Sequence, residues 1–299
     1  MTRNSSRLVA VAVAAAALAG TAAGAAAADE APGKAAAAVQ QQKARAMKAG
    51  SAGAPYFSLE TMDQAGKTFF YTWDVKGKLE KRIQMFDDER NTRAATQVDM
   101  DQDGIPMGDT YFLTGDGSVI LQRPLEEQTE RKIASGFEKY DVFFSPGNLG
   151  GGKQPDLLTR DKKGVLWLHL AKPDGSFTGA KQIGGGWGQY TQITGKGDLT
   201  GDGKADVVAR DKDGVLWLYK GTGDWKKPFE ARTKIGAGWN QYNLIHGAGD
   251  TDWDGHSDLV VRDKSGALWR YKGTGKASAP FKAKEKIGNS GWNQYRLVF

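Results

Sequence analysis

The sequence predicts an all-β fold, a β-propeller of about five four-stranded blades. The first observation is a repeat of about 50 residues, marked by Leu-Trp pairs 50 and 52 residues apart at Trp167, Trp217 and Trp269. The second is a series of tyrosines 50, 52 and 53 residues apart, at positions 140, 190, 242 and 295. The third is that each repeat contains several short strand-like segments and no apolar stripe of helical period. Repeats of this length and content are typical of propeller blades.

Each repeat is predicted to be β-structure because short runs rich in Val, Tyr and Trp alternate with Gly and Asp. In DVVARDKDGVLWLYKG the segment 211–214 predicts a hairpin turn, since Gly214 can adopt a positive φ, and 161–164 and 263–266 repeat it. The units span approximately 56–93, 94–139, 140–189, 190–241 and 242–299. The last segment, 295–299, matches only the opening strand of a unit. We expect it to pair with the N-terminal unit and close the ring.

The N-terminal 28 residues have the pattern of a secretory signal peptide. Arg3 and Arg7 precede a 12-residue apolar run and an Ala-rich stretch, and that run is too short to span a membrane permanently. Residues 29–54 contain no aromatic side chain and predict a flexible leader, in which glutamines 40–42 beside Lys43 leave open an exposed site for transglutaminase cross-linking. Residues 55–299 would then form the propeller of a secreted, extracellular protein with no integral membrane segment.

The composition limits how the chain can be stabilised and which partners it can bind. The chain has no Cys, so burial of a core or cation binding must stabilise it in place of disulfides. Its net charge is +6, and removing residues 1–28 takes away two arginines and no acids. No run of five basic residues occurs, which argues against a nucleic-acid partner. We expect a monomer.

The segment DTDWDGHSD at 250–258 predicts a calcium-binding loop. Asp250, Asp252, Asp254 and Asp258 stand at positions 1, 3, 5 and 9, a Gly follows the third Asp, and His256 can offer its backbone carbonyl. Oxygen ligands at alternate positions suit Ca²⁺, which takes six to eight of them. Position 12 holds Val261 where an EF-hand has Glu, so the loop is predicted to lie between strands.

Equivalent loops occur in three other units. The segment 198–206 offers side chains or carbonyls of Asp198, Thr200, Asp202, Lys204 and Asp206, with fewer charges and so weaker predicted binding. A third loop carries Asp99, Asp101 and Asp103 but has Met107 at position 9 and Asp109 two residues late, so binding there stays open. The segment 148–156 retains only Asn148 and Asp156, and no ion is expected. The alternative for all four is a polar turn whose Asp side chains cap their own backbone.

The segments GKGDLTGDGKADVVARDKDGVLWLY and GAGDTDWDGHSDLVVRDKSGALWRY resemble the FG-GAP or VCBS-type repeats of secreted bacterial proteins, which are related to the propeller repeats of integrin α chains. The resemblance is specific over about residues 140–299 and weak before them. It implies a β-propeller with structural calcium in loops between strands, held at the aspartates of 198–206 and 250–258. It also implies a role in adhesion, carbohydrate binding or protein interaction.

Two interpretations apply to the repeated tryptophans. Their recurrence favours packing between blades. Alternatively, an aromatic face next to an amide can form a sugar pocket between blades. The candidate ligand residues on the second view are Trp187, Gln189, Trp239, Gln241, Trp292 and Gln294, with the off-register Trp225 and Trp253 as further candidates.

Catalysis has little support in the sequence. The histidines at 169, 246 and 256 have no metal-binding spacing, and no GxSxG elbow or Cys nucleophile exists. We therefore predict a binding module with structural Ca²⁺ and no enzyme activity, recognising a carbohydrate as a lectin does. The alternative is a module for an extracellular protein partner, such as an adhesin, a protease inhibitor or regulator, or a cross-linked matrix protein. A secreted hydrolase is less favoured.

Overall fold

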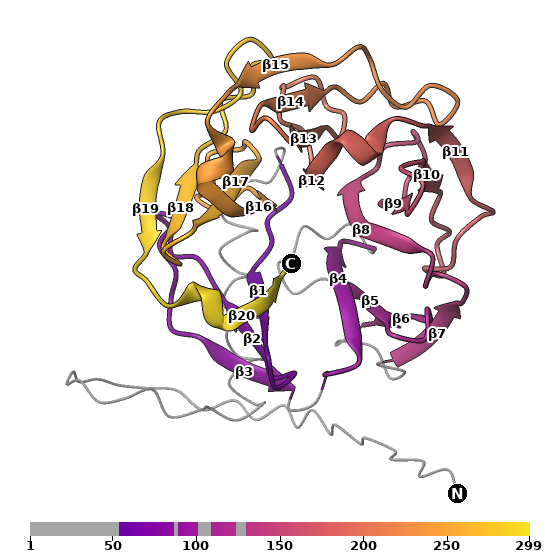
Figure 1. Ribbon diagram of the computed structural model, residues 1–299, viewed down its shortest axis with the longest axis horizontal. Coiled ribbons are helices and arrows are strands. Elements are labelled where there is room, and N and C mark those ends of the chain that lie inside the picture. The colour runs from indigo at the N-terminus through magenta and orange to yellow at the C-terminus, as the bar shows by residue number, and fades with distance from the viewer. Residues whose placement is uncertain (1–53, 87–88, 101–108, 124–129) are drawn as a thin grey trace, which may run out of the picture.

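The computed structural model describes residues 54–86, 89–100, 109–123 and 130–299, and these residues form five four-stranded antiparallel sheets arranged in a ring (Figure 1). The predicted all-β propeller is therefore confirmed. The predicted signal peptide and nearly all of the predicted leader lie outside the described residues. No helix in the described part of the chain has the length and apolar content to span a bilayer.

The sheets follow the sequence repeat, one blade per unit. Blade 1 contains β20 (Tyr295–Val298), β1 (Leu59–Asp63), β2 (Thr68–Tyr71) and β3 (Ile83–Phe86). Blade 2 contains β4 (Thr92–Val98), β5 (Asp109–Thr114), β6 (Val119–Gln122) and β7 (Glu130–Ala134). Blade 3 contains β8 (Tyr140–Gly147), β9 (Asp156–Asp161), β10 (Leu166–His169) and β11 (Lys181–Gly184).

Blades 4 and 5 complete the ring and are joined to their neighbours by short 3-10 turns. Blade 4 contains β12 (Tyr190–Thr194), β13 (Val207–Asp211), β14 (Leu216–Tyr219) and β15 (Thr233–Gly236). Blade 5 contains β16 (Tyr242–Gly249), β17 (Asp258–Asp263), β18 (Leu268–Tyr271) and β19 (Glu285–Gly288). The turns are η1 (Trp187–Gln189), η2 (Trp239–Gln241) and η3 (Trp292–Gln294). In every blade the first strand lies nearest the centre and the fourth at the rim (Figure 1).

The ring closes by pairing the two ends of the described chain. The antiparallel register places Thr61 opposite Val298, and Glu60 and Phe299 exchange backbone hydrogen bonds of 3.0 and 2.9 Å. Phe299 is buried and packs edge-on against Phe112 of blade 2. The predicted closure by the last strand is thus confirmed, and blade 1 is built from both ends of the repeat domain.

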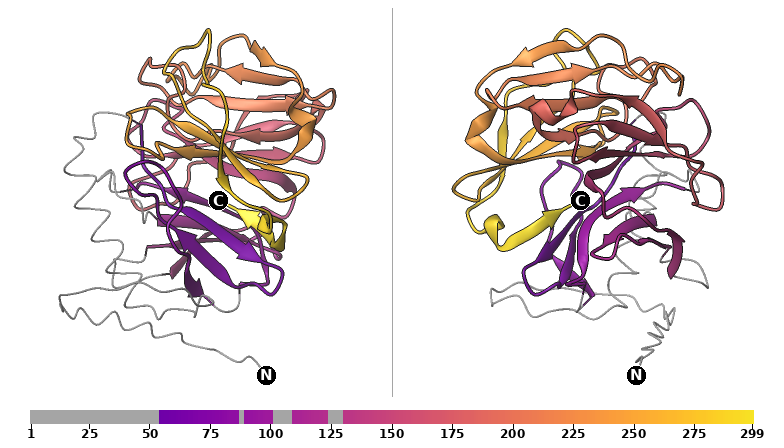
Figure 2. Two further views of the ribbon diagram at one scale, coloured as in Figure 1. Left: turned by 90° about the vertical axis from the view of Figure 1, so that its left-hand side faces the viewer. Right: turned by 45° about the vertical axis from the view of Figure 1, so that its right-hand side comes forward.

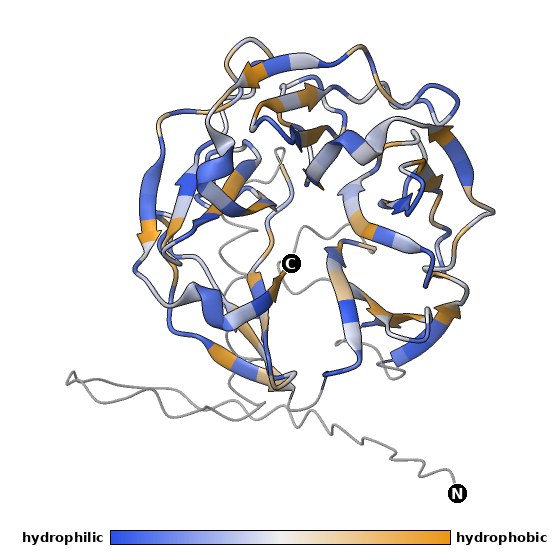
Figure 3. Ribbon diagram, in the orientation of Figure 1, coloured by the Kyte–Doolittle hydropathy of each residue, from blue (hydrophilic) through white to orange (hydrophobic). Residues whose placement is uncertain are grey.

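Apolar side chains form the packing between blades. Apolar and hydrophilic residues alternate along individual strands (Figure 3), as expected where sheets pack in layers. One buried cluster joins Leu158 and Leu168 of blade 3 to Ile193 and Val207 of blade 4, and a second joins blades 4 and 5. Each sheet buries its face only against a neighbour, so the blades depend on one another for stability. Views from the side show the blades as layered sheets (Figure 2).

An arginine fastens each of three successive blade connections; Arg210 is buried, and the other two are partly buried. Arg210 on β13 donates from Nη1 to the carbonyl oxygens of Trp239 and Tyr242, at 3.1 and 2.6 Å, where the chain passes into blade 5. The equivalent arginines, 160 and 262, make the same pair of bonds in the preceding and following connections. One guanidinium therefore links a strand of one blade to two backbone carbonyls where the chain enters the next.

We expect Arg210→Leu to lower the free energy of unfolding by about 1.5–3 kcal/mol, because it removes charged hydrogen bonds to two carbonyl oxygens. Denaturant titration followed by tryptophan fluorescence measures the change. Lys212→Leu, at an exposed position of the neighbouring turn, serves as the control and should stay within about 0.5 kcal/mol of the parent. Equal effects of the two substitutions would show that Arg210 does not fasten the blades.

Candidate functional site

The acidic loop 250–258 connects β16 and β17 and brings three carboxylates together. One carboxylate oxygen from each of Asp250, Asp252 and Asp254 lies within 4.8 Å of the others. The Asp250 carboxylate also accepts backbone hydrogen bonds from Asp254 at 3.2 Å and Gly255 at 2.8 Å, which curl the loop around it. Three of the four predicted aspartates thus surround one point.

The environment of Asp252 tests whether this cluster suits a cation. Its Oδ1 is buried and has no hydrogen-bond partner among the described residues, as expected for an oxygen placed to ligate an ion. Its Oδ2 lies 2.6 Å from Lys272 Nζ and 3.6 Å from Arg270 Nη2. The cluster could hold a metal, although the protein's own cations already balance part of its charge.

The aspartate at position 9 has another role in three loops. Asp258 is not one of the three clustered carboxylates and accepts the backbone N–H groups of Thr251 and Gly273, at 3.2 and 2.8 Å. Asp206 and Asp156 make the equivalent bonds. Burial raises the pKa of Asp258 to about 7 and that of Asp206 to about 6. Because the loop predicted to bind no ion shares this arrangement, position 9 shapes the backbone independently of a metal.

The loop 198–206 forms no such cluster of three carboxylates in the described structure. Asp198 accepts backbone hydrogen bonds from Thr200 at 2.8 Å and Gly203 at 2.6 Å, and Asp202 lies 3.4 Å from Lys220. Lys204, whose carbonyl was predicted as a ligand, is exposed. Calcium binding at this loop stays a prediction.

In the loop that begins at Asp99, the predicted ligands Asp101 and Asp103 lie outside the described residues. Asp109 begins β5 opposite Val98, just as Asp258 begins β17 opposite Gly249. Asp109 therefore occupies the place of position 9, and the segment 99–109 is two residues longer than 250–258. The similarity between DTYFLT at 109–114 and DLVVRD at 258–263 indicates in the sequence that Asp109 is equivalent to Asp258.

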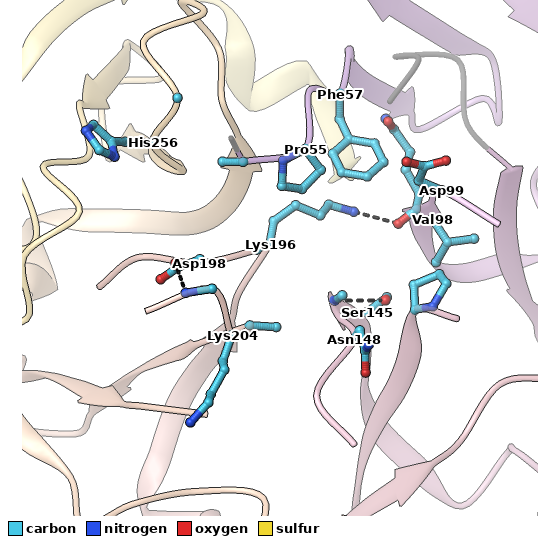
Figure 4. A pocket seen from close by; sticks show the side chains of 18 of the residues that line it. Pro55, Phe57, Val98, Asp99, Ser145, Asn148, Lys196, Asp198, Lys204 and His256 are labelled. Carbon is cyan, nitrogen blue, oxygen red and sulfur yellow. Dashed lines mark hydrogen bonds between the residues drawn. The ribbon is translucent and has the colours of Figure 1, made fainter. Parts of the chain in front are cut away.

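A pocket of about 590 Å³ lies where these loops meet (Figure 4). Asp99, Asn148, Asp198 and His256, each from a different blade, line it. Lys196, which the sequence did not single out, is another lining residue and is buried, with Nζ 2.6 Å from the Gln97 carbonyl oxygen. Its burial lowers the pKa of the ammonium group.

The side chain of Lys196 also interacts with an aromatic and an acidic residue. Its Nζ lies 4.3 Å from the centre of the Phe57 ring. Burial raises the pKa of Glu60, which interacts electrostatically with the same ammonium. The pocket thus combines an apolar wall with charges of both signs.

The repeated tryptophans pack between blades. Trp187 and Trp239 are 6% and 7% exposed, and their rings lie 4.5 and 4.9 Å from those of Tyr219 and Tyr271. Trp292 is partly buried, 4.8 Å from Tyr71. This burial fits the packing interpretation and leaves the ring faces of Trp187 and Trp239 little access to a sugar.

The amides that follow these rings have local roles. Gln189 and Gln241 donate from Nε2 to the carbonyl oxygens of Gly186 and Gly238, at 2.8 and 2.9 Å, and so stabilise the 3-10 turns. Gln294 is exposed. These amides do not converge on one pocket, because each belongs to a separate connection between blades.

The two off-register tryptophans differ from each other. Trp225 is 37% exposed, with Lys181 Nζ 4.7 Å from its ring centre. Trp253 adopts a φ of 63° and stacks on Tyr56 with ring centres 4.0 Å apart. Trp225 thus remains available to a ligand, whereas Trp253 secures the start of the propeller against the acidic loop.

His169 occupies the place in blade 3 that Tyr219 and Tyr271 occupy in blades 4 and 5. It is buried among aromatic rings, its Nε2 lies 2.9 Å from Thr159 Oγ1, and burial lowers its pKa to about 4. The unfolded chain therefore binds a proton between pH 6.5 and 4 that the folded chain does not. Stability from this group is present above pH 6.5 and is lost as the pH falls toward 4.

We expect His169→Tyr to reduce this acid sensitivity. Relative to the variant, the parent should lose roughly 2–3 kcal/mol of unfolding free energy between pH 7.5 and pH 4.5. Denaturant titrations of both proteins at the two pH values give the difference directly. Identical losses would mean that His169 titrates normally in the folded protein.

Comparison with known proteins finds one family match, over part of the chain, and distant structural similarity. No curated protein matches the chain. The crystal structure of BP39L lectin from Burkholderia pseudomallei is similar at a TM-score of 0.42 and 15% identity, over 79% of this chain and 71% of the lectin. That of human WBSCR16 is similar at a TM-score of 0.31 and 11% identity, over 74% of this chain, which spans only 62% of that chain. Residues 198–261, which include two acidic loops, match the FG-GAP-like repeat family. These residues lie in blades 4 and 5, so an FG-GAP-like repeat segment forms part of this five-bladed β-propeller.

Proposed function

We propose that the protein is a secreted, calcium-stabilised binding module that recognises a carbohydrate in its central pocket. The observation that carries the proposal is the convergence of loops from four blades on a pocket of about 590 Å³. This volume lies within the range of roughly 300–1,000 Å³ typical of small-molecule sites. Four different loops can be varied there without disturbing the blades, as is usual for binding surfaces on rigid scaffolds.

Asp250, Asp252 and Asp254 would hold the calcium ion. Their clustered oxygens and the unpartnered Oδ1 of Asp252 fit a hard cation that prefers oxygen ligands. The bound ion would supply positive charge that holds the loop in one conformation. Because Lys272 and Arg270 already lie near Asp252, we expect weak affinity, in the range of about 10⁻⁴–10⁻³ M seen in extracellular modules.

The chemistry of the pocket favours a polyhydroxyl ligand. Asn148, Asp198 and Lys204 offer donors and acceptors of both charge signs, which suits hydroxyl groups better than a strongly charged ligand. Phe57 supplies one apolar surface. We infer binding without turnover, since the patterned carboxylates are engaged in loop structure.

A protein partner is the second candidate, and Trp225 favours it. This ring is exposed, lies 5.6 Å from Lys226 Nζ and is separate from the central pocket. Exposed tryptophans are enriched among the residues that dominate protein interfaces. On this view the protein would act as an adhesin, an inhibitor or a matrix component.

Added Ca²⁺ should raise the melting temperature of the chelator-treated protein by about 4–8 °C when the ion is roughly 30-fold above its Kd. Asp250→Asn should remove most of this shift, because it weakens the central carboxylate of the cluster. Asp213→Asn, an exposed turn residue outside the acidic loops, is the matched control and should retain the full shift. Equal melting temperatures with EDTA and with Ca²⁺ would refute the calcium assignment.

A glycan array probed with the full chain tests the carbohydrate assignment. We expect selective binding to a few glycans, reduced at least about tenfold by Lys204→Glu, which reverses a charge in the pocket without changing the core. Lys212→Glu, outside the pocket, controls for net charge. Uniform absence of binding, together with capture of a purified protein that depends on Trp225, would favour the protein partner instead.

A further inference from the structure

In blades 1, 4 and 5 a basic side chain just before the fourth strand fills the same position. We call this arrangement the cation cluster: a third-strand ring, the first-strand tyrosine and the basic group that contacts both. In blade 4 the Arg232 Cζ lies 4.0 Å from the centre of the Trp217 ring, and the guanidinium donates to the Tyr190 hydroxyl. In blade 5 the Lys284 Nζ lies 4.6 Å from the Trp269 ring centre and 2.9 Å from the Tyr242 hydroxyl.

The cluster of blade 1 shows that the arrangement tolerates changes of residue type. Its Arg82 Cζ lies 4.5 Å from the centre of the Phe69 ring, and Nη1 lies 3.1 Å from the Tyr295 hydroxyl. The basic residue of the cluster can therefore be an arginine or a lysine, and the third-strand ring can be a Trp or a Phe. What recurs is a cation between an aromatic face and a phenolic oxygen, an interaction favoured by the charge distribution of both.

Blade 3 has the third-strand ring, Trp167, and the first-strand tyrosine, Tyr140, but no basic residue just before its fourth strand. The register of β10 with β11 places Ala180 where the other blades have Arg232 and Lys284. A cavity of about 220 Å³ lies there, lined by Ala180 together with the aromatic side chains Phe137, Tyr140, His169 and Phe177. Small residues at this point thus leave a space that the other clusters fill with a basic side chain.

The Tyr140 hydroxyl is the polar group that this space leaves without a partner. Tyr140 is only 3% exposed, and its hydroxyl makes no hydrogen bond within the described part of the chain. The hydroxyls of Tyr190, Tyr242 and Tyr295 each bond to a second tyrosine. In blade 3 that second residue is His169, whose Nε2 bonds to Thr159 instead. Because Tyr140 lines the cavity, its hydroxyl is open to a ligand there that supplies a hydrogen-bond donor.

We propose that this cavity binds a guanidinium or primary ammonium group of a ligand, which takes the place of the missing basic side chain. An arginine side chain on a polypeptide partner is the occupant that the geometry fits best, since Arg232 fills the equivalent position from its own backbone. The site lies between blades 2 and 3, separate from the central pocket and the acidic loops. It depends on neither calcium nor carbohydrate binding.

The charges around the cavity permit this occupant. Lys139 also lines it, with Nζ 5.1 Å from the Tyr140 ring centre. Blade 5 shows that two cations can share one cluster, because Lys284 and Lys286 lie 4.6 and 5.7 Å from the same ring centre. Burial lowers the pKa of His169 to about 4, so this imidazole is neutral at pH 7 and adds no repulsion.

The test is an NMR titration of the full chain with N-acetylarginine amide, followed through the ring resonances of Tyr140, His169 and Phe137. We expect saturable shifts with one site per chain. The citrulline analogue, which has the same shape without the charge, should bind at least about tenfold more weakly. A pentapeptide with a central arginine that binds more tightly than the amide points to a polypeptide source, and equal affinities point to a small molecule.

Three variants locate the site. Ala180→Arg should fill the cavity with a tethered cation and abolish binding of the probe. Tyr140→Phe removes one oxygen and should weaken binding severalfold while leaving the melting temperature nearly unchanged, so it remains informative if the first variant folds poorly. Arg232→Ala should open a second site in blade 4 and raise the stoichiometry toward two.

Two results would overturn the proposal. The first is equal binding of the arginine and citrulline probes, which would show that the cavity recognises shape without charge. The second is unchanged binding in both Ala180→Arg and Tyr140→Phe, which would place the probe elsewhere on the protein.

Discussion

The pairing of β20 with β1 is the constraint on which the rest of the structure depends. Five sheets that each bury a face against the next can enclose a common centre only if the last sheet meets the first. Here one blade takes strands from both ends of the repeat domain, so opening the ring requires breaking the ladder between Thr61 and Val298. Phe299 extends the closure into blade 2 through Phe112. The central pocket exists because the ring is closed.

Within the closed ring, recurring polar contacts stabilise the blades and the connections between them. The candidate binding sites lie where the residues of one blade differ from those at the equivalent positions of the others. The arginines equivalent to Arg210 and the aspartates equivalent to Asp258 have the same partners in successive blades, with or without a predicted ion. By contrast, the three clustered carboxylates occur in one described loop, and the cation is missing from one cluster. These differences in side chains give single blades a distinct binding chemistry while the strand arrangement stays the same. A rigid repeat scaffold can acquire separate sites in this way.

Periodicity was sufficient to predict the blades, the closing strand and the packing of Trp187 and Trp239, because all three follow from spacing along the chain. The grouping of Asp250, Asp252 and Asp254 was also predictable, since alternate residues of one tight loop converge. Lys196 was not, because its partners Gln97 and Glu60 lie far away in sequence and meet it only after closure. The role of Asp109 was hidden by a two-residue insertion, and that of Ala180 by the fact that an absent side chain leaves no motif.

Hydrogen exchange of the Glu60 and Phe299 amides tests the closure most directly, because these two groups bond to each other's carbonyls where the ring joins. If the ring opens only on global unfolding, both amides should exchange as slowly as those in the central strands of blade 4. Exchange at rates typical of a frayed terminus, while blade 4 stays protected, would show that the last strand is loosely attached and that the blades are stable without a closed ring.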